Sequence, residues 1–175
     1  MTRGRAESRL GLHAEAAGDI TRALAYCDEA HRPPEPDYYL ERARELAAAG
    51  NEHLDEAVRG LDEGVRLLGP IVSLQLPAID LDLELGLYDA ALARLDTIAA
   101  QSPRKEGWLA RRAAILEKAG RPAEARAACT EALAAIAGLP PARRSVAAIR
   151  ELEQSLNATL GRLASRSEDS SGGGL

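Results

Sequence analysis

Apolar and polar residues alternate along residues 79–87, as they do in a half-buried β-strand. The same segment also fits a helix, because Ile79 and Leu83 are four residues apart and share a helix face. A glycine ends the segment, and a second apolar stretch with helical spacing follows it. We therefore interpret residues 79–87 as part of a broadly buried helix. Pro77 predicts either a kink in this helix or a helix that begins near that residue.

The chain carries an internal repeat of 34 residues, marked by four alanines at that spacing and by a glycine before each. The alanines are Ala23, Ala57, Ala91 and Ala125, and the glycines are Gly18, Gly50, Gly86 and Gly120. Apolar residues four and seven positions after each alanine fall on one helix face. Each glycine predicts the end of a helix, where a left-handed backbone disfavours a Cβ atom. Every unit is thus predicted to be a helix, a tight turn and a second helix.

The repeat divides the chain into four units, at about residues 3–35, 36–69, 70–103 and 104–137. The stretch "NEHL" before Ala57 indicates a two-residue insertion in the turn of the second unit. Residues 141–164 have apolar positions at helical spacing and are predicted to form one helix that caps the fourth unit. The repeat domain would then span residues 1–164. Residues 165–175 are polar and end in glycines, which predicts a disordered tail.

Composition supports an all-α protein. Hydrophobic residues make up 46% of the chain but aromatic residues only 3%, with no Phe, which favours closely packed helices over an aromatic-rich sheet core. The net charge of −5 argues against a general nucleic-acid binder. No apolar stretch approaches the roughly 20 residues that span a bilayer, and the N-terminus has no signal-peptide pattern. We therefore expect a cytoplasmic protein without a membrane partner.

Two stretches carry the repeat most clearly, "GLYDAALARLDTIAAQSP" at residues 86–103 and "GRPAEARAACTEAL" at residues 120–133. A 34-residue helix–turn–helix unit with small residues and a terminal proline resembles the tetratricopeptide repeat, and the resemblance covers about residues 3–137. It implies a right-handed superhelix of stacked hairpins whose concave surface, lined by the first helices, binds peptides or protein segments. The residues agree independently, because one hairpin cannot bury its apolar face alone and stacked hairpins form an extended solenoid.

Residues on the predicted first helices are the candidates for lining this concave groove. The predicted peptide-binding residues are Arg5, Leu12, Leu40, Arg44, Leu76, Asp80, Leu83, Arg111 and Glu117. Some members of the family hold a C-terminal carboxylate with Lys, Asn and Arg on these helices, but this lining has almost no Lys or Asn. Its mixture of apolar, basic and acidic residues suits a peptide that has both apolar and charged side chains.

Nothing in the sequence indicates a catalytic or metal site, and no cofactor is predicted. Cys27 and Cys129 share a repeat position with leucines, which predicts core packing. None of the histidines (His13, His31 and His53) has a second ligand at helical spacing that would fix a metal. The carboxylates Asp80, Asp82 and Glu84 are expected to be solvated. The glycines follow the repeat and form no phosphate-binding loop.

The sequence therefore predicts a non-catalytic scaffold that binds a protein or peptide in its groove. An alternative is a regulatory or docking module, or a fragment, of a larger protein that could be an enzyme. Met1 falls near the start of the first unit, which leaves the N-terminal end without a predicted cap. This favours the fragment interpretation, and it also allows self-association through that end. RNA binding by a related helical repeat would require a basic groove, which the net charge disfavours.

Overall fold

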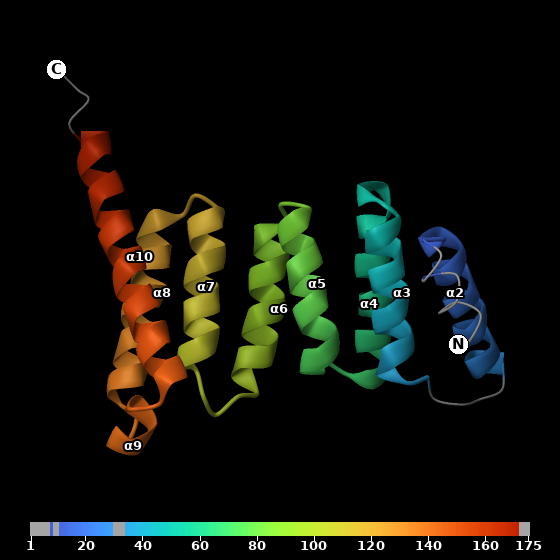
Figure 1. Ribbon diagram of the computed structural model, residues 1–175, viewed down its shortest axis with the longest axis horizontal. Helices are drawn as coiled ribbons and strands as arrows, with labels where there is room; N and C mark the ends of the chain where they lie inside the picture. The colour runs from blue at the N-terminus through green and yellow to red at the C-terminus, as the bar shows by residue number, and fades with distance from the viewer. Residues whose placement is uncertain (1–7, 9–10, 30–33, 172–175) are drawn as a thin grey trace. The chain divides into compact units, whose positions relative to one another are not determined.

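The computed structural model describes residues 8, 11–29 and 34–171, and these contain helices and no strand (Figure 1). The helices are α2 (His13–Glu29), α3 (Pro36–Ala49), the 3-10 turn η1 (Asn51–His53), α4 (Leu54–Leu68), α5 (Val72–Glu84), α6 (Tyr88–Ala100), α7 (Glu106–Lys118), α8 (Pro122–Ala137), α9 (Pro141–Arg144) and α10 (Ala147–Ser171). The predicted all-α class is confirmed. The chain forms two compact units, residues 1–98 and 99–175.

The segment with alternating apolar residues is helical, as the broad-burial interpretation requires. Helix α5 begins at Val72 and continues through Pro77, so the alternative of a helix start near Pro77 is wrong. Leu74, Ala78 and Ile79 are all fully buried, while Asp80 is exposed. Burial of apolar side chains on both sides of Pro77 compensates for the single backbone N–H that proline removes from the helix.

The second helices of three hairpins begin at the same place in the repeat. Helices α4, α6 and α8 each start three residues before a repeat alanine, and Ala57, Ala91 and Ala125 are fully buried. Gly86 ends the first helix of its hairpin with a φ of +74°, which a residue with a Cβ adopts only with strain. In the second repeat, at residues 36–69, Gly50 is followed by η1 before α4 begins. The predicted insertion is thus confirmed as an extra 3-10 turn.

The first repeat, at residues 3–35, differs from the prediction. Helix α2 is continuous from His13 to Glu29 and contains Gly18, so Gly18 ends no helix. The turn glycine is Gly11, with a φ of +76°, and the fully buried alanine is Ala16, five residues after it. Ala23 is only half-buried. Seven residues are nearly two helical turns, so Ala16 and Ala23 share a face, and the 34-residue spacing selects the wrong one.

A glycine on α4 allows α3 and α5 to pack closely in the first unit. Gly64 is buried, and a Cβ there would lie 2.8 Å from Cγ of Tyr39 and 3.0 Å from Cδ1 of Leu74. Tyr39 and Leu74 are themselves almost fully buried, and they join Leu61 in one apolar cluster that runs from α2 to α5. Any larger residue at position 64 would push one of these helices away.

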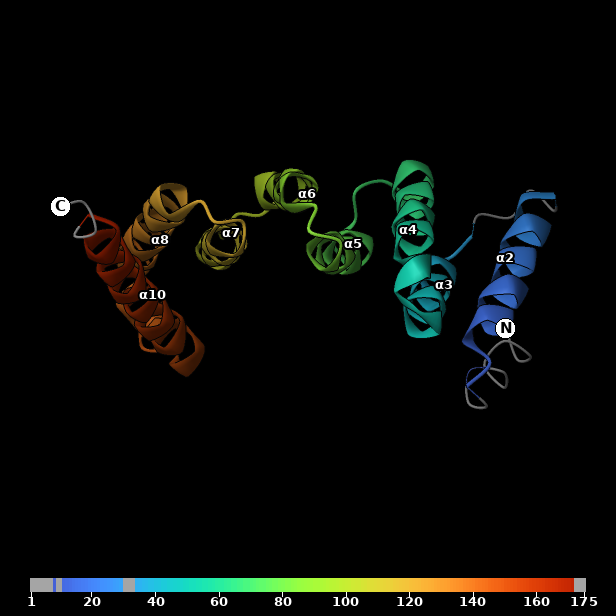
Figure 2. The ribbon, with the colours of Figure 1, turned by 90° about the horizontal axis from the view of Figure 1, so that it is seen from above.

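In the second unit, α10 covers the α7–α8 hairpin (Figure 2). Leu156 and Leu163 of α10 are 4% and 1% exposed, and Arg126 of α8 donates to the carbonyl of Leu163 at 2.9 Å. The expected single helix at 141–164 is instead two helices, interrupted at Ser145 and Val146. Helix α10 also continues to Ser171, into the stretch expected to be disordered, because residues 165–171 contain no Gly or Pro to stop it.

Candidate functional site

The structure places most of the predicted peptide-binding residues on first helices. Leu40 and Arg44 lie on α3; Leu76, Asp80 and Leu83 lie on α5; Arg111 and Glu117 lie on α7. Leu12 is a correction: it follows the turn at Gly11, directly before α2, and is 43% exposed. Its misplacement follows from the seven-residue error in the first repeat. Arg5 lies outside the described residues.

In the first unit, these residues come from two helices in direct contact, α3 and α5. Arg44 and Asp80 are exposed, whereas the three leucines are half-buried. Leu40 and Arg44 are one turn apart, as are Leu76 and Asp80, so each helix places a charge beside an apolar side chain. This surface combines half-buried apolar area with a basic and an acidic group, as binding to a mixed peptide requires.

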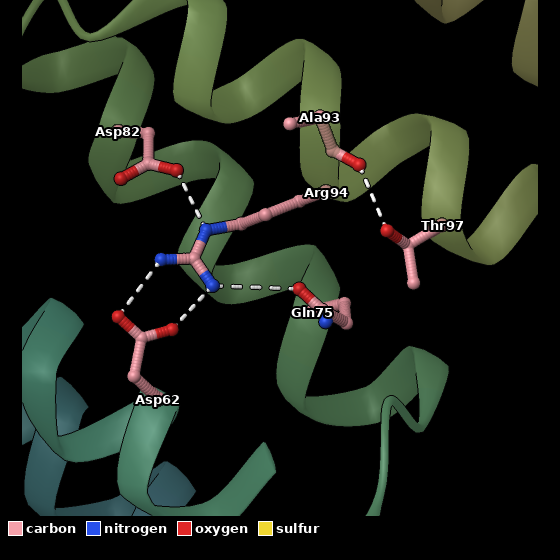
Figure 3. A network of polar contacts seen from close by, with 6 residues as sticks. All are labelled: Asp62, Gln75, Asp82, Ala93, Arg94 and Thr97. Carbon is pink, nitrogen blue, oxygen red and sulfur yellow. Dashed lines mark hydrogen bonds and ion pairs between the residues drawn. The ribbon is translucent and has the colours of Figure 1, made fainter. Parts of the chain in front are cut away.

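Arg94 of α6 joins three helices through a polar network that the sequence did not reveal (Figure 3). Its Nε donates to Oδ2 of Asp82 on α5 at 2.7 Å, and Nη1 and Nη2 donate to Asp62 on α4 at 2.5 and 3.1 Å. Nη1 also lies 3.5 Å from Oε1 of Gln75. Asp82 is 1% exposed, so the expectation that it is solvated is wrong. Burial raises the pKa of Asp82 above that of an ordinary aspartate, although the hydrogen bond from Arg94 acts to lower it.

A second buried arginine joins α3 to α4. Nη2 of Arg42 donates to Oε2 of Glu63 at 2.7 Å and to the carbonyl of Gly60 at 3.3 Å, and its guanidinium lies 5.6 Å from the ring centroid of Tyr39. A Cβ at position 60 would come within 2.8 Å of Nη2 of Arg42, so the glycine makes room for this side chain. Its Nε is buried without a hydrogen-bond partner. Arg42 and Arg94 share a sequence signal, because most residues three or four positions away on the same helix face are apolar in both cases.

The two cysteines have different surroundings. Cys129 is fully buried on α8, and burial raises the pKa of its thiol above the ordinary value for cysteine. Cys27 is only half-buried. Core packing is therefore the right interpretation for Cys129, and only partly so for Cys27. A buried thiol with a raised pKa is a poor nucleophile, because the thiolate is the reactive form.

The histidines with described positions contact carboxylates. Nδ1 of His13 lies 2.8 Å from Oε2 of Glu45 and so links α2 to α3. The ring nitrogens of His53 lie 3.9 Å from Glu52 and 4.0 Å from Glu56. His31 lies outside the described residues. Within the part of the chain that the structure describes, no group of three or more His, Cys, Asp or Glu side chains could hold a metal ion.

Helix α10 changes the surroundings of the two predicted residues on α7. Nη2 of Arg162 on α10 donates to Oε2 of Glu117 at 3.2 Å, so the chain's own helix already engages Glu117. Arg111 is half-buried and lines a cleft of about 480 Å³ between the starts of α7 and α10. Trp108 of α7 and Leu152 of α10 line the same cleft. The fourth hairpin therefore offers a cleft formed together with α10 and not an open first-helix face.

No helix among residues 11–29 and 34–171 combines the length and the apolar character that crossing a membrane requires.

No protein-family model and no curated protein matches the chain. Solved structures do. TPR-like repeats of a Podosopora anserina protein described as a kinesin light chain match with a TM-score of 0.56, at 17% identity, over 95% of this chain and 93% of that chain. A variant of the same repeats matches with a TM-score of 0.62, at 16% identity, over 96% and 84%. A structure described as "MamA MSR-1 C2" matches with a TM-score of 0.53, at 17% identity, over 97% and 95%.

The fold is a tetratricopeptide-like repeat fold. At these identities the likeness concerns the fold alone. It accounts for the buried alanine near the start of each second helix, where two helices of a hairpin approach closely. It also accounts for contacts that run mainly between helices one or two positions apart along the chain.

Proposed function

We propose that the protein is a non-catalytic scaffold that binds a protein or peptide segment along the first helices of its repeats. The observation that carries this proposal is the surface of α3 and α5, where Arg44 and Asp80 are exposed beside half-buried leucines. Repeat folds stack short hairpins and so present extended surfaces to partners. A segment with both apolar and charged residues would complement this surface.

The hydrogen bonds of the two buried arginines support a structural role for Arg42 and Arg94. Arg94 is satisfied by Asp62 and Asp82, and Arg42 is held by Glu63. General acid–base chemistry needs a titratable group within reach of a substrate. Burial raises the pKa of Asp82, but this carboxylate is only 1% exposed and is hydrogen-bonded to Arg94, so it is out of reach of a substrate. The absence of catalysis, of nucleic-acid and membrane partners and of a metal stays a prediction, as does the cytoplasmic location.

Affinity capture from the native lysate tests the scaffold function. The bait is the full chain, compared with Arg44→Glu on α3 and with Arg59→Glu on α4, a second helix; both arginines are exposed and both substitutions change the charge equally. We expect a specific protein to be captured by the wild type and by Arg59→Glu and to be lost with Arg44→Glu. If all three baits capture the same proteins, or none captures any, binding along the first helices is wrong.

A further inference from the structure

The two units of the chain carry opposite net charge. Residues 1–98 contain ten Lys and Arg against 19 Asp and Glu, a net charge of −9, whereas residues 99–175 contain twelve against eight, a net charge of +4. An acidic segment is therefore repelled by the first unit and attracted by the second. A basic segment experiences the reverse.

The positive charge of the second unit is concentrated at one end. Helix α9 and the starts of α7 and α10 lie together at that end (Figure 1). They and the loop before α7 carry a group of basic residues, Arg104, Lys105, Arg111, Arg143, Arg144 and Arg150. All of them are exposed except Arg111, which is half-buried.

The cleft beside Arg111 opens at this basic end. Its lining includes three apolar side chains, all half-buried: Trp108 of α7 and Ile149 and Leu152 of α10. Arg104 and Arg111 also line it. An aromatic side chain in a pocket flanked by arginines is the combination that most often contributes binding energy at protein interfaces.

One acidic residue lines the cleft, and its contacts limit its effect. Glu106 is 6% exposed, and its Oε1 lies 3.7 Å from Nε of Arg104. The carboxylate is therefore turned into the protein and helps to hold Arg104, whose own side chain is 63% exposed. The arginine remains accessible to a second carboxylate.

We infer that this cleft binds an acidic peptide segment that carries an aliphatic anchor. The aliphatic side chain packs against Trp108 and Leu152, and flanking carboxylates face Arg104 and Arg111. The inference rests on the proposed scaffold function and specifies the chemistry of its partner. The charge of the first unit strengthens the choice, because it leaves the basic end of α7 and α10 as the favourable place for an acidic segment.

A glycine in the cleft provides a variant that blocks it without damaging the fold. Gly107 lines the cleft in the first turn of α7, and a Cβ built there meets no atom within 4 Å. Leucine at this position fills the cleft and improves helix propensity. Gly161 in α10 is a matched control, because it is exposed, lies outside the cleft and also has open space around its Cβ position.

The test uses the fluorescence of Trp108, which is the one tryptophan of the chain and lines the cleft. The full chain is titrated with a short synthetic peptide of leucines among glutamates, and with the same peptide carrying lysine in place of glutamate. We expect a saturable emission change with the acidic peptide and none with the basic one. Gly107→Leu should weaken the binding by about tenfold or more, and Gly161→Leu should leave it unchanged.

Equal titration of Gly107→Leu and the wild type would overturn the inference, as would equal binding of the lysine peptide. A Trp108 response that appears without peptide as protein concentration rises, together with dimers in sedimentation, would assign the cleft to the acidic unit of a second copy and overturn it too. Failure of this titration while capture still depends on Arg44 leaves the scaffold function standing. The expected titration without such capture supports the cleft and removes binding along α3.

Discussion

Burial of the Asp82 carboxylate depends on one partner. Arg94 reaches it from α6 and at the same time binds Asp62 on α4, so a single side chain compensates for a charge that is 1% exposed. A buried ion pair adds little stability compared with an apolar pair, but removing one member leaves an uncompensated charge. The network therefore makes the positions of α4, α5 and α6 depend on one another.

Removal of Arg94 should be costly. For Arg94→Ala we expect the free energy of unfolding in urea to fall by about 3 kcal/mol, because Asp82 stays buried without its cation. Arg59→Ala, on the exposed face of α4, should change it by less than about 0.5 kcal/mol. The double variant Arg94→Ala/Asp82→Ala should lose less than the sum of the two single variants, because the second substitution removes the unpaired charge. Additive losses would contradict the network.

The cysteines should differ in reactivity. At mildly alkaline pH we expect a thiol reagent to label Cys27 in the folded protein and to label Cys129 only after unfolding. Burial shields the Cys129 thiol, and it also raises the pKa of that thiol, which keeps the thiolate fraction low. Mass spectrometry after timed labelling distinguishes the two sites. Equal labelling of both in the folded protein would show that α10 does not cover α8 as described.

Much of the hairpin pattern could be predicted because the helix period constrains it. Ala57, Ala91 and Ala125 mark the hairpins correctly, since each is buried three residues inside a second helix. The first repeat could not be placed the same way. A shift of seven residues preserves the helix face, so apolar pattern alone cannot distinguish Ala16 from Ala23. A backbone property decides between them, the positive φ at the turn glycine.

Glycine substitutions check this assignment. Gly18→Ala should stabilise the protein by up to about 1 kcal/mol, because Gly18 lies inside α2, where a Cβ meets its nearest atom, Nη1 of Arg22, at 3.8 Å. Gly86→Ala should destabilise it by about 1 kcal/mol, because the φ of +74° disfavours alanine. Thermal or urea unfolding measures both. Destabilisation by Gly18→Ala would restore Gly18 as a turn residue.

Candidate site residues were harder to predict than helices, because their surroundings depend on the neighbouring element. Repeat position placed Arg44, Asp80 and Glu117 on equivalent first helices, and all three lie on such helices. The structure separates them: Arg44 and Asp80 are exposed, while Glu117 binds Arg162 of α10. Helix α10 follows no 34-residue repeat, so the sequence period gave no information on which side chains it covers. The same helix creates the cleft beside Trp108.

The connectivity of contacts predicts how the whole molecule responds to local damage. Helix contacts run mainly between helices one or two positions apart along the chain, so a destabilising substitution should act locally. Arg94→Ala should speed amide hydrogen exchange in α4 to α6 more than in α7 to α10. Leu163→Ala should do the reverse, because Leu163 is 1% exposed where α10 packs and its truncation leaves a cavity there. Exchange measured by mass spectrometry on both variants forms a crossed comparison in which each serves as the control for the other. Equal acceleration in both units by either substitution would show that the chain unfolds as one cooperative body, and local action would then be wrong.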